Sequence, residues 1–284
     1  MSELNLIKEL REKTGAGFLD CKNALKENNN EIELSIDSLR KKGLSKAIKK
    51  SSREAKEGAV GFYNNENISV IIKINSETDF AAKSNTFLDF LDIIGNIALK
   101  QNNPYLNLED FLNVKENNKN ISDLLTEMIA KIGENLIINE LKVFDNKELN
   151  VNYYIHNPYR KNIGKIVSAI FFSTEQFSDE IQIFSKNLCM HIAASKPEAI
   201  DIDQLSSSVI ENEKKIQKEM IQDSGKPSNI IEKILEGKIK KFYSEVTLLN
   251  QNFVIDPEKT IKDAINEINS SNKFDLKKYA LMSL

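Results

Sequence analysis

The first fifty residues alternate apolar positions at helical spacing with short polar breaks. The apolar positions that recur are Leu6, Ile7 and Leu10, then Phe18, Cys21, Ala24 and Leu25, then Ile32, Ile36 and Leu39. This spacing predicts three short helices, the second over roughly 18–27 and the third from a capping-box-like start at Asn30 and Glu33 to a stop at Gly43. A bundle this small has a thin core, so we expect it to serve as a docking unit.

A basic stretch with few strong apolar residues follows over residues 41–56. Its basic side chains are Lys41, Lys42, Lys46, Lys49, Lys50, Arg53 and Lys56. A solvated linker or linker helix is the favoured interpretation, and a stripe that faces phosphates or an acidic partner is the alternative.

Alternation replaces the helical spacing from Ile68 to Asn75, which predicts a strand with one buried face. Residues 60–63 are expected to pair with this strand as a hairpin, and residues 76–80 to form a turn. The apolar spacing then predicts a helix over about 84–100.

The same order of elements recurs further along the chain. A second hairpin is expected over 152–156 and 163–172, and a helix through 183–193 follows it. At an offset of 95 residues, the pair Ile97–Ala98 falls on Ile192–Ala193 without a gap. Two related halves, rather than a chance match, are the economical explanation. They predict an α+β fold in which helices cover one face of antiparallel sheet.

Residues 205–242 carry a sparser apolar stripe, with glutamate and lysine at most other positions. A turn at Ser224–Pro227 divides them, which predicts an antiparallel helical hairpin that is mostly solvated. Residues 245–249 and the segment from Phe274 onward are expected to return as strands or short helices.

The overall composition narrows the classes of function. The chain has 284 residues, of which 39 are basic and 42 acidic, and its formal net charge of -3 argues against a dedicated nucleic-acid-binding protein. Cys21 and Cys189 lie far apart in sequence and suggest no disulfide framework. Since neither a secretory signal nor a run of about 18 apolar residues is visible, we expect a cytoplasmic protein.

Motifs that would indicate an enzyme are missing from the sequence. There is no G-x-x-x-x-G-K-[ST] and no G-x-G-x-x-G motif, and Thr14–Gly17 is interpreted as a turn between helices. His156 and His191 are the only histidines, and Cys189 and His191 point to different faces of a helix. We therefore expect no enzymatic activity, no metal site and no cofactor, and a structural role for His191.

The turn at Thr78, Asp79 and Phe80 combines a carboxylate with a large apolar ring, just after a strong strand. Such a ring on a turn tip is costly unless something covers it. On local grounds, the favoured interpretation is that Phe80 folds back onto its own core and that Asp79 caps the next helix. The alternative is that a partner protein covers the ring.

Six blocks of sequence resemble one family, in the family's order along the chain. They are Leu10–Leu25 (LREKTGAGFLDCKNAL), Thr78–Lys83 (TDFAAK), Lys131–Asn135 (KIGEN), Met190–Pro197 (MHIAASKP), Ser224–Pro227 (SGKP) and Phe253–Val254. The family that they resemble is translation elongation factor Ts, and the resemblance extends to about residue 262.

The resemblance implies a guanine nucleotide exchange factor. Such a factor binds elongation factor Tu with GDP, displaces Mg²⁺ and promotes GDP release, and it stays bound until GTP binds again. The implied domains are a ubiquitin-associated-like three-helix domain with the basic linker at 1–54, core halves at 55–140 and 141–284, and a coiled coil inserted at about 205–242. The expected partner is elongation factor Tu in its GDP-bound and nucleotide-free forms, as a heterodimer or heterotetramer, with no membrane and no direct nucleic-acid contact.

The resemblance also assigns roles to individual residues. Partner binding and Mg²⁺ displacement are implied for Thr78, Asp79, Phe80 and Ala81. Partner binding is implied for Lys22, Ile132, Gly133, His156, Val254 and Ile255. Structural alternatives stay open, because Ile132 and Val254 would also suit a core position and Gly133 would also suit a turn.

Three features depart from the family's pattern. The loop from His156 to Ile163 is longer than the family's usual turn, and Asn252 replaces a usual proline. Since the chain ends soon after Phe274, we also expect the C-terminal helical module of longer members to be absent. Competing interpretations are a nucleic-acid-binding module that uses residues 41–56, a small-molecule enzyme, and a family member that binds its partner but exchanges nucleotide poorly.

Overall fold

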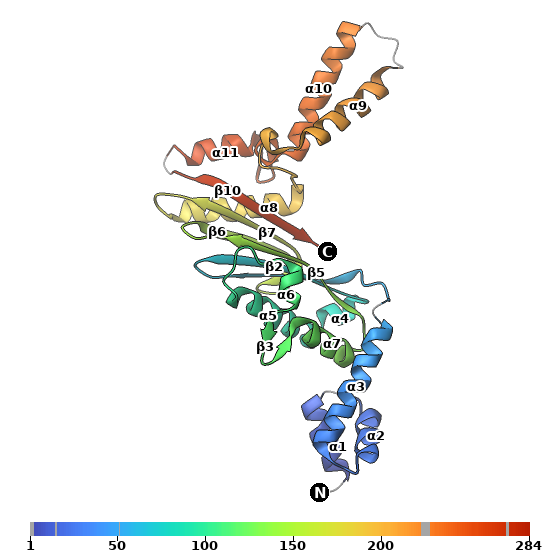
Figure 1. The fold of residues 1–284 in the computed structure, drawn as a ribbon. Coiled ribbons are helices and arrows are strands. Elements are labelled where there is room, and N and C mark those ends of the chain that lie inside the picture. The colour runs from blue at the N-terminus through green and yellow to red at the C-terminus, as the bar shows by residue number, and fades with distance from the viewer. Residues whose placement is uncertain (1–2, 15, 51, 223–227, 271–272) are drawn as a thin grey trace. The chain divides into compact units, whose positions relative to one another are not determined.

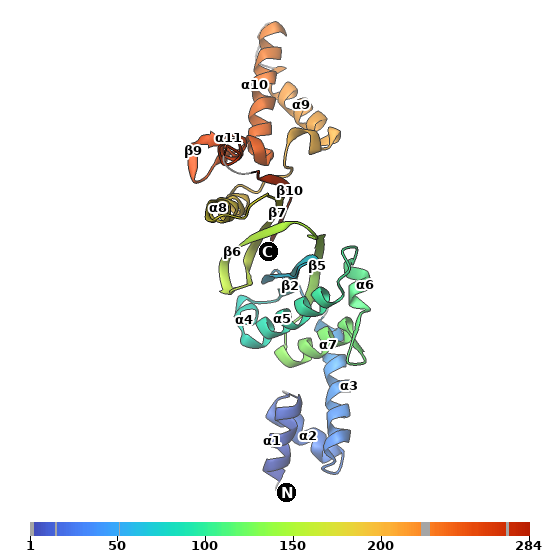
Figure 2. The same cartoon turned by 90° about the vertical axis from the view of Figure 1, so that its left-hand side faces the viewer.

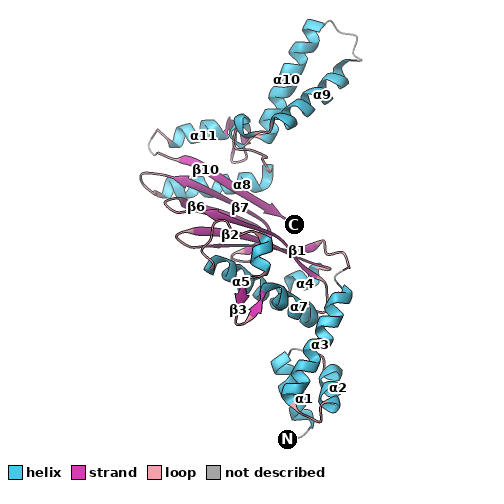
Figure 3. Cartoon of the chain, viewed as in Figure 1, coloured by secondary structure: helices cyan, strands magenta, loops and turns pink. Residues whose placement is uncertain are grey.

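The structure is a computed structural model, and the chain in it divides into two compact units (Figure 1). The residues that it describes are 3–14, 16–50, 52–222, 228–270 and 273–284. Unit 1 comprises Met1–Lys147, Asn157–Ile166 and Met282–Leu284, and unit 2 comprises Glu148–His156 and Val167–Leu281. The chain therefore passes from one unit to the other four times, each time within or beside a strand. Helices and antiparallel strands are mixed in both units, so the fold class is α+β (Figure 3).

Unit 1 begins with three helices, α1 (Glu3–Thr14), α2 (Phe18–Glu27) and α3 (Ile32–Lys50). Their shared core consists of Ile7, Leu10, Cys21, Ala24, Leu25 and Leu39. The expected bounds of the second helix are confirmed.

The expected stop at Gly43 is wrong, because α3 continues to Lys50. A Cβ atom on Gly43 would lie 2.9 Å from the Cβ of Ala130, which belongs to α7 (Ile121–Ile132). Glycine is therefore used here for close helix packing, and this contact outweighs its weak helix propensity. The basic stretch over residues 41–50 is accordingly part of a helix.

The sheet of unit 1 contains β1 (Glu57–Asn64), β2 (Ile68–Ser76) and β5 (Leu136–Asp145), with β2 antiparallel to both neighbours. The start of β7 (Ile163–Ser173) pairs with β1. The expectation that β2 has one buried face is wrong, because both faces are buried. The strand is central, and Ile71 on its second face lies opposite buried Phe62 of β1.

Helices cover one face of this sheet, as Figure 2 shows for α5 and α7. They are α4 (Asp79–Lys83), α5 (Asn85–Lys100), α6 (Leu108–Leu112) and α7, with a small hairpin of β3 (Lys115–Glu116) and β4 (Lys119–Asn120) between the last two. Ser84 starts α5 by accepting a hydrogen bond from the Phe87 amide at 3.2 Å. Phe87, Leu91, Ile94 and Ile97 of α5 then pack with β2 into one core.

The long loop expected after His156 is wrong, because β6 (Asn150–Arg160) continues through it. Pro158 is tolerated in this strand since β6 pairs only with β7, and a strand with one neighbour leaves room for a residue without an N–H. The following turn is held to α5 by Arg160, whose guanidinium lies 2.6 Å from Asp89 and 2.7 Å from Asp92.

Unit 2 contains α8 (Asp179–Ser195), β8 (Asn252–Phe253), β9 (Asp256–Thr260) and α11 (Ile261–Ile268), together with most of β7 and most of β10 (Asp275–Ser283). Its core is rich in aromatic rings. The centroid of Phe274 lies 4.7 Å from that of Phe172 and 5.2 Å from that of Phe184. The predicted offset of 95 residues agrees with the element bounds, because β2 and β7 begin at Ile68 and Ile163.

Two further helices of unit 2, α9 (Ser207–Gln222) and α10 (Ser228–Val246), contact each other where the sequence predicts a helical hairpin. Lys238 donates to the side chain of Gln217 at 2.8 Å across this contact. The turn expected at Ser224–Pro227 lies outside the described residues. Two short 3-10 turns, η1 (Ile202–Gln204) and η2 (Leu248–Asn250), flank the pair.

Candidate protein-binding site

The turn after β2 presents a short helix, α4, whose start is fixed by Thr78. The Thr78 backbone is extended, and its hydroxyl accepts a hydrogen bond from the Ala81 amide at 3.2 Å. The Thr78 carbonyl accepts from the Ser76 hydroxyl at 2.9 Å and from the Ala82 amide at 3.2 Å. The N-cap is therefore Thr78, and the expectation that Asp79 caps the helix is wrong.

Phe80 points away from the core and is 84% exposed. The next two residues, Ala81 and Ala82, are buried, so α4 turns its small residues inward and its aromatic ring outward. The local expectation that Phe80 folds back onto its own core is therefore wrong. An aromatic ring in this position is available to another molecule.

Asp79 lies beside the ring and forms an ion pair with Lys83, with 2.7 Å between Oδ2 and Nζ. The hydrogen bond from Lys83 is the largest cause that lowers the pKa of Asp79 below its ordinary value of 3.8. The Asp79 carboxyl is therefore ionised at neutral pH next to an exposed ring, with Lys83 as its counter-charge.

A second loop, Gly133–Asn135, lies directly against this turn. The Glu134 carboxylate accepts from the Thr78 amide at 2.9 Å and from the Thr78 hydroxyl at 2.8 Å. In the opposite direction, Glu77 accepts from the Asn135 amide at 2.6 Å. The structure thus brings Ile132 and Gly133 next to the Thr78–Ala81 segment, far apart in sequence.

Gly133 ends α7 in the left-handed conformation, with φ of 87°. It is exposed, whereas Ile132 is half-buried against the core of unit 1. Lys50, at the end of α3, donates to the Gly133 carbonyl. The backbone of this loop is therefore held from two sides, by α3 and by the Thr78 turn.

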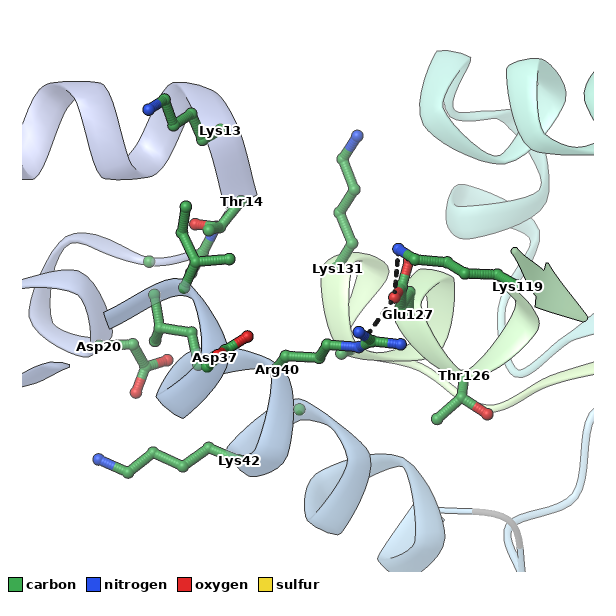
Figure 4. Close-up of a pocket in the computed structure, with 16 residues that line it drawn as sticks. Lys13, Thr14, Asp20, Asp37, Arg40, Lys42, Lys119, Thr126, Glu127 and Lys131 are labelled. Atoms are coloured by element: carbon green, nitrogen blue, oxygen red, sulfur yellow. Dashed lines mark hydrogen bonds and ion pairs between the residues drawn. The ribbon is translucent and has the colours of Figure 1, made fainter. Parts of the chain in front are cut away.

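Lys22 is exposed on α2, in the three-helix part of unit 1, and its Nζ lies 3.8 Å from Glu3. It does not belong to the Thr78–Gly133 cluster. Figure 4 shows the cavity of about 330 Å³ that lies between these helices and α7. Arg40 of α3 and Lys119 lie 3.2 and 2.7 Å from Glu127 beside this cavity.

The other predicted partner-binding residues lie in unit 2. His156 is exposed, and its Nδ1 lies 3.1 Å from the Tyr154 hydroxyl. Val254 and Ile255, between β8 and β9, are 51% and 50% exposed, so the core interpretation of Val254 is wrong.

Buried His191 supports the Val254 turn from below. Its Nδ1 accepts from the Val254 amide at 3.3 Å, so its Nε2 carries the proton and donates to Gln251 Oε1 at 2.9 Å. Burial lowers the pKa of His191 below its ordinary value of 6.5, which favours this neutral form. The expected structural role of His191 agrees with these contacts.

Among the described residues, no cluster of three or more His, Cys, Asp or Glu side chains has the arrangement of a metal site. In the same part of the chain, no helix is both long and apolar enough to cross a membrane. The residue that the sequence analysis missed is Glu134. Its position within the KIGEN block was the only available signal, because its partner Thr78 is 56 residues away.

Comparison of the sequence with known proteins provides independent evidence of the family to which the chain belongs. The family described as Elongation factor TS matches residues 77–283. Elongation factor Ts of Rickettsia prowazekii (strain Madrid E) is 38% identical over 284 residues, covering 98% of this chain and 90% of the relative. The chain belongs to the elongation factor Ts family.

Two further family members show the same level of similarity. Elongation factor Ts of Allorhizobium ampelinum is 38% identical over 268 residues, covering 92% of this chain and 85% of the relative. Elongation factor Ts of Ehrlichia ruminantium (strain Welgevonden) is 38% identical over 267 residues, covering 93% of this chain and 92% of the relative. As a member of the elongation factor Ts family, the chain is a translation elongation factor of protein biosynthesis.

Proposed function

We propose that this chain is the guanine nucleotide exchange factor for elongation factor Tu. It binds the GDP-bound GTPase, displaces Mg²⁺, promotes GDP release and stays bound until GTP binds again. The observation that carries this proposal is the capped turn with Phe80 84% exposed beside the charged Asp79, in a chain of the elongation factor Ts family.

The physical basis is a difference in binding free energy between two states of the partner. In a GTPase, Mg²⁺ bridges nucleotide phosphates and protein oxygens, so a wedge that moves this region weakens the nucleotide. A factor that binds the nucleotide-free partner more tightly must weaken GDP by the same coupling free energy. Tenfold weakening needs about 1.4 kcal/mol, and covering a Phe ring supplies about that much.

The same partner is proposed to cover the remaining site residues. Support for Gly133 is its exposure beside the Thr78 turn, and half-buried Ile132 precedes it. Support for His156, Val254 and Ile255 is their exposure in unit 2, and for Lys22 its exposure on α2. The interface would therefore draw on both units, in a heterodimer or heterotetramer in the cytoplasm.

The domain boundaries and the coiled coil implied by the resemblance are part of this proposal. Residues 1–54 would form the ubiquitin-associated-like domain with its linker, and 55–140 and 141–284 the two core halves. The contact between α9 and α10 supports a coiled coil within about 205–242.

The basic stretch gives little support to the competing nucleic-acid interpretation. Lys42 pairs with Glu27 at 2.8 Å, and Arg53 pairs with Glu77 at 3.4 Å. Lys50 is occupied by the Gly133 carbonyl. These cations hold the protein's own elements together, so fewer of them are free to neutralise phosphates.

The test is release of a fluorescent GDP analogue from purified elongation factor Tu, with and without this protein. The wild-type chain should accelerate release, and the Asp79→Ala/Phe80→Ala variant should do so at least about tenfold less at equal concentration. If both bind the partner and neither accelerates release, the chain only docks. Absence of both binding and release would refute the proposed function.

A further inference from the structure

We infer that Glu134 is a positioning residue: its carboxylate holds Thr78 from the neighbouring loop and thereby fixes the direction in which Phe80 and Asp79 are presented. That Phe80 and Asp79 act on a partner rests on the proposed function. The fixing itself is a property of the isolated chain.

The helix α4 is only weakly stabilised by its own backbone hydrogen bonds. The helix has only 5 residues, Asp79–Lys83, and isolated helices shorter than about 12 residues are marginal in water. Its direction must therefore be set by what surrounds it. Burial of Ala81 and Ala82 and the hydrogen bond from the Ser84 hydroxyl to the Ala81 carbonyl at 2.8 Å hold the end of α4, so the contacts of Thr78 decide how its start is held.

All polar atoms of Thr78 have hydrogen-bond partners. Its amide and its hydroxyl donate to the two oxygens of Glu134, at 2.9 and 2.8 Å. The hydroxyl oxygen also accepts from the Ala81 amide at 3.2 Å, and the carbonyl accepts from Ser76. Because the hydroxyl accepts from Ala81, its single proton is directed to Glu134 and the N-cap cannot turn freely.

Glu134 binds Thr78 through strong hydrogen bonds and lies in a loop that is itself fixed. Glu134 is half-buried and accepts two charge-assisted hydrogen bonds, which are about twice as strong as neutral ones. Its loop is itself fixed by Asn135, which is 1% exposed and whose side chain donates to the Arg53 carbonyl at 2.7 Å. Glu134 therefore acts from a rigid support onto the turn.

A matched control lies in the same pair of loops. The Glu77 carboxylate makes the reciprocal contact: it accepts from the Asn135 amide at 2.6 Å and pairs with Arg53 at 3.4 Å, so these bonds do not involve the Thr78 cap. Glu77→Gln should therefore weaken the junction of the two loops without releasing the cap of α4. Glu134→Gln keeps the size of the side chain but places an NH₂ group against one of the two Thr78 donors.

The chain contains no tryptophan, so Phe80→Trp introduces a single indole at the tip, which can be excited at wavelengths where the tyrosines do not absorb. We expect Glu134→Gln to increase the fast local motion of this indole in fluorescence anisotropy decay at least about twofold, and Glu77→Gln to leave it unchanged. Thr78→Val, which removes the hydroxyl, should reproduce the effect, and Thr78→Ser should restore wild-type behaviour. Unchanged indole motion in folded Glu134→Gln and Thr78→Val would overturn the inference.

Nucleotide exchange supplies the second measurement, with Phe80 as the natural ring. Glu134→Gln should slow the stimulated release of GDP about tenfold, which corresponds to about 1.4 kcal/mol. In the Phe80→Ala background, the same substitution should have at most about a twofold further effect, because the ring that it positions is gone. Equal effects in both backgrounds would show a general structural role and contradict the inference.

The two measurements keep the two proposals apart. If the wild-type chain fails to accelerate GDP release, the proposed function fails, while the indole motion still decides the role of Glu134. If the wild-type chain accelerates release and Glu134→Gln does so equally well, the positioning role fails and the exchange function stands.

Discussion

The turn from β2 to α5 and the turn from β7 to α8 each carry a phenylalanine, at Phe80 and Phe177. In unit 1 the chain inserts α4, which leaves the Phe80 ring 84% exposed. In unit 2 the chain enters α8 directly, and Phe177 stacks on Phe172 with 6.2 Å between ring centroids and 21° between planes. Phe177 is still 50% exposed, so the two segments differ in that the Phe177 ring has a stacking partner in its own unit, whereas the Phe80 ring is almost wholly open.

The C-terminal ends of α5 and α8 also differ in which residues are exposed and which are buried. At the offset of 95 residues, Asn96 of α5 corresponds to His191 of α8. Asn96 is exposed and donates to the Asp92 carbonyl at 2.7 Å, whereas His191 is fully buried under the turn at Val254. Unit 1 thus exposes a large ring before the start of α5, at Phe80, and unit 2 exposes an apolar residue over the end of α8, at Val254. The comparison teaches that the shared plan supplies a core, and that added segments decide where apolar groups become available.

The largest effect tests whether the two cores are equivalent. Ile97 and Ile192 correspond by the offset and are 2% and 0% exposed. We expect Ile97→Ala and Ile192→Ala each to lower the free energy of unfolding by about 2–5 kcal/mol, since both leave cavities in packed cores. Urea denaturation of the two variants measures this. A loss below about 1 kcal/mol in either variant would show that only one half has a tight core.

The next effect separates the two phenylalanines. Phe80→Ala should slow stimulated GDP release at least about tenfold and leave the melting temperature unchanged, because the ring is exposed in the isolated chain. Phe177→Ala should lower stability by about 1 kcal/mol, since the ring is stacked, and keep exchange within about twofold. Melting curves and GDP-release rates of both variants are the measurements. If Phe177→Ala slowed GDP release without lowering stability, the two phenylalanines would not differ in role as proposed.

The free energy of unfolding should depend on pH through His191, which supports the exposed turn at Val254. Because burial lowers the pKa of His191 in the folded chain, the unfolded chain binds the proton more readily as the pH falls below about 6.5. The stability contribution of the neutral imidazole is therefore present above pH 6.5 and is lost on acidification. Urea denaturation from pH 7.5 to 5.5 should show this loss in the wild-type chain and not in His191→Gln. The same slope in both proteins would exclude His191 as its source.

The smallest effect concerns the exposed pair of Asp79 and Lys83. Exposed ion pairs contribute little to stability, so Lys83→Gln should leave the melting temperature at neutral pH unchanged. The pKa of Asp79 should rise towards its ordinary value of 3.8, because the hydrogen bond that lowers it is gone. The pair's contribution exists above that pH and disappears as the pH falls through the folded pKa. An NMR titration of the Asp79 carboxyl would detect the shift, and no shift would mean that Lys83 does not set it.

The sequence predicted the regular parts of the fold well where local spacing decides them. The helix expected over about 84–100 is Asn85–Lys100, because Ser84 is a good N-cap and the apolar stripe of α5 is continuous. The spacing failed where a distant residue decides. Gly43 continues a helix because of Ala130, and Pro158 lies within a strand because β6 pairs only with β7.

The residues of the candidate site were indicated by resemblance, which says nothing of how the structure joins them. Resemblance indicated Thr78–Ala81 and Ile132–Gly133 as separate segments, and nothing local indicates that they meet. The bonds that join them run between Thr78 and Glu134 and between Glu77 and Asn135, more than 50 residues apart in each case. The local sequence around Phe80 favoured a ring that folds back onto the protein's own core. It does so because a single sequence does not show which apolar side chains are left exposed for another protein.

The route of the chain between the units sets an order of events during synthesis. Residues 282–284 belong to unit 1, where Lys73 donates to the Ser283 carbonyl at 3.2 Å and the Leu284 amide to the Lys165 carbonyl at 3.1 Å. A ribosome that adds about 5–20 residues per second reaches them on the order of ten seconds after it has completed β5. During that time, the sheet that supports the Phe80 turn exists as a nascent intermediate that lacks its final contacts. The hydrogen bonds that fix the Phe80 turn itself all lie within residues 76–135, so the turn can be completed before residues 282–284 add their contacts to the sheet.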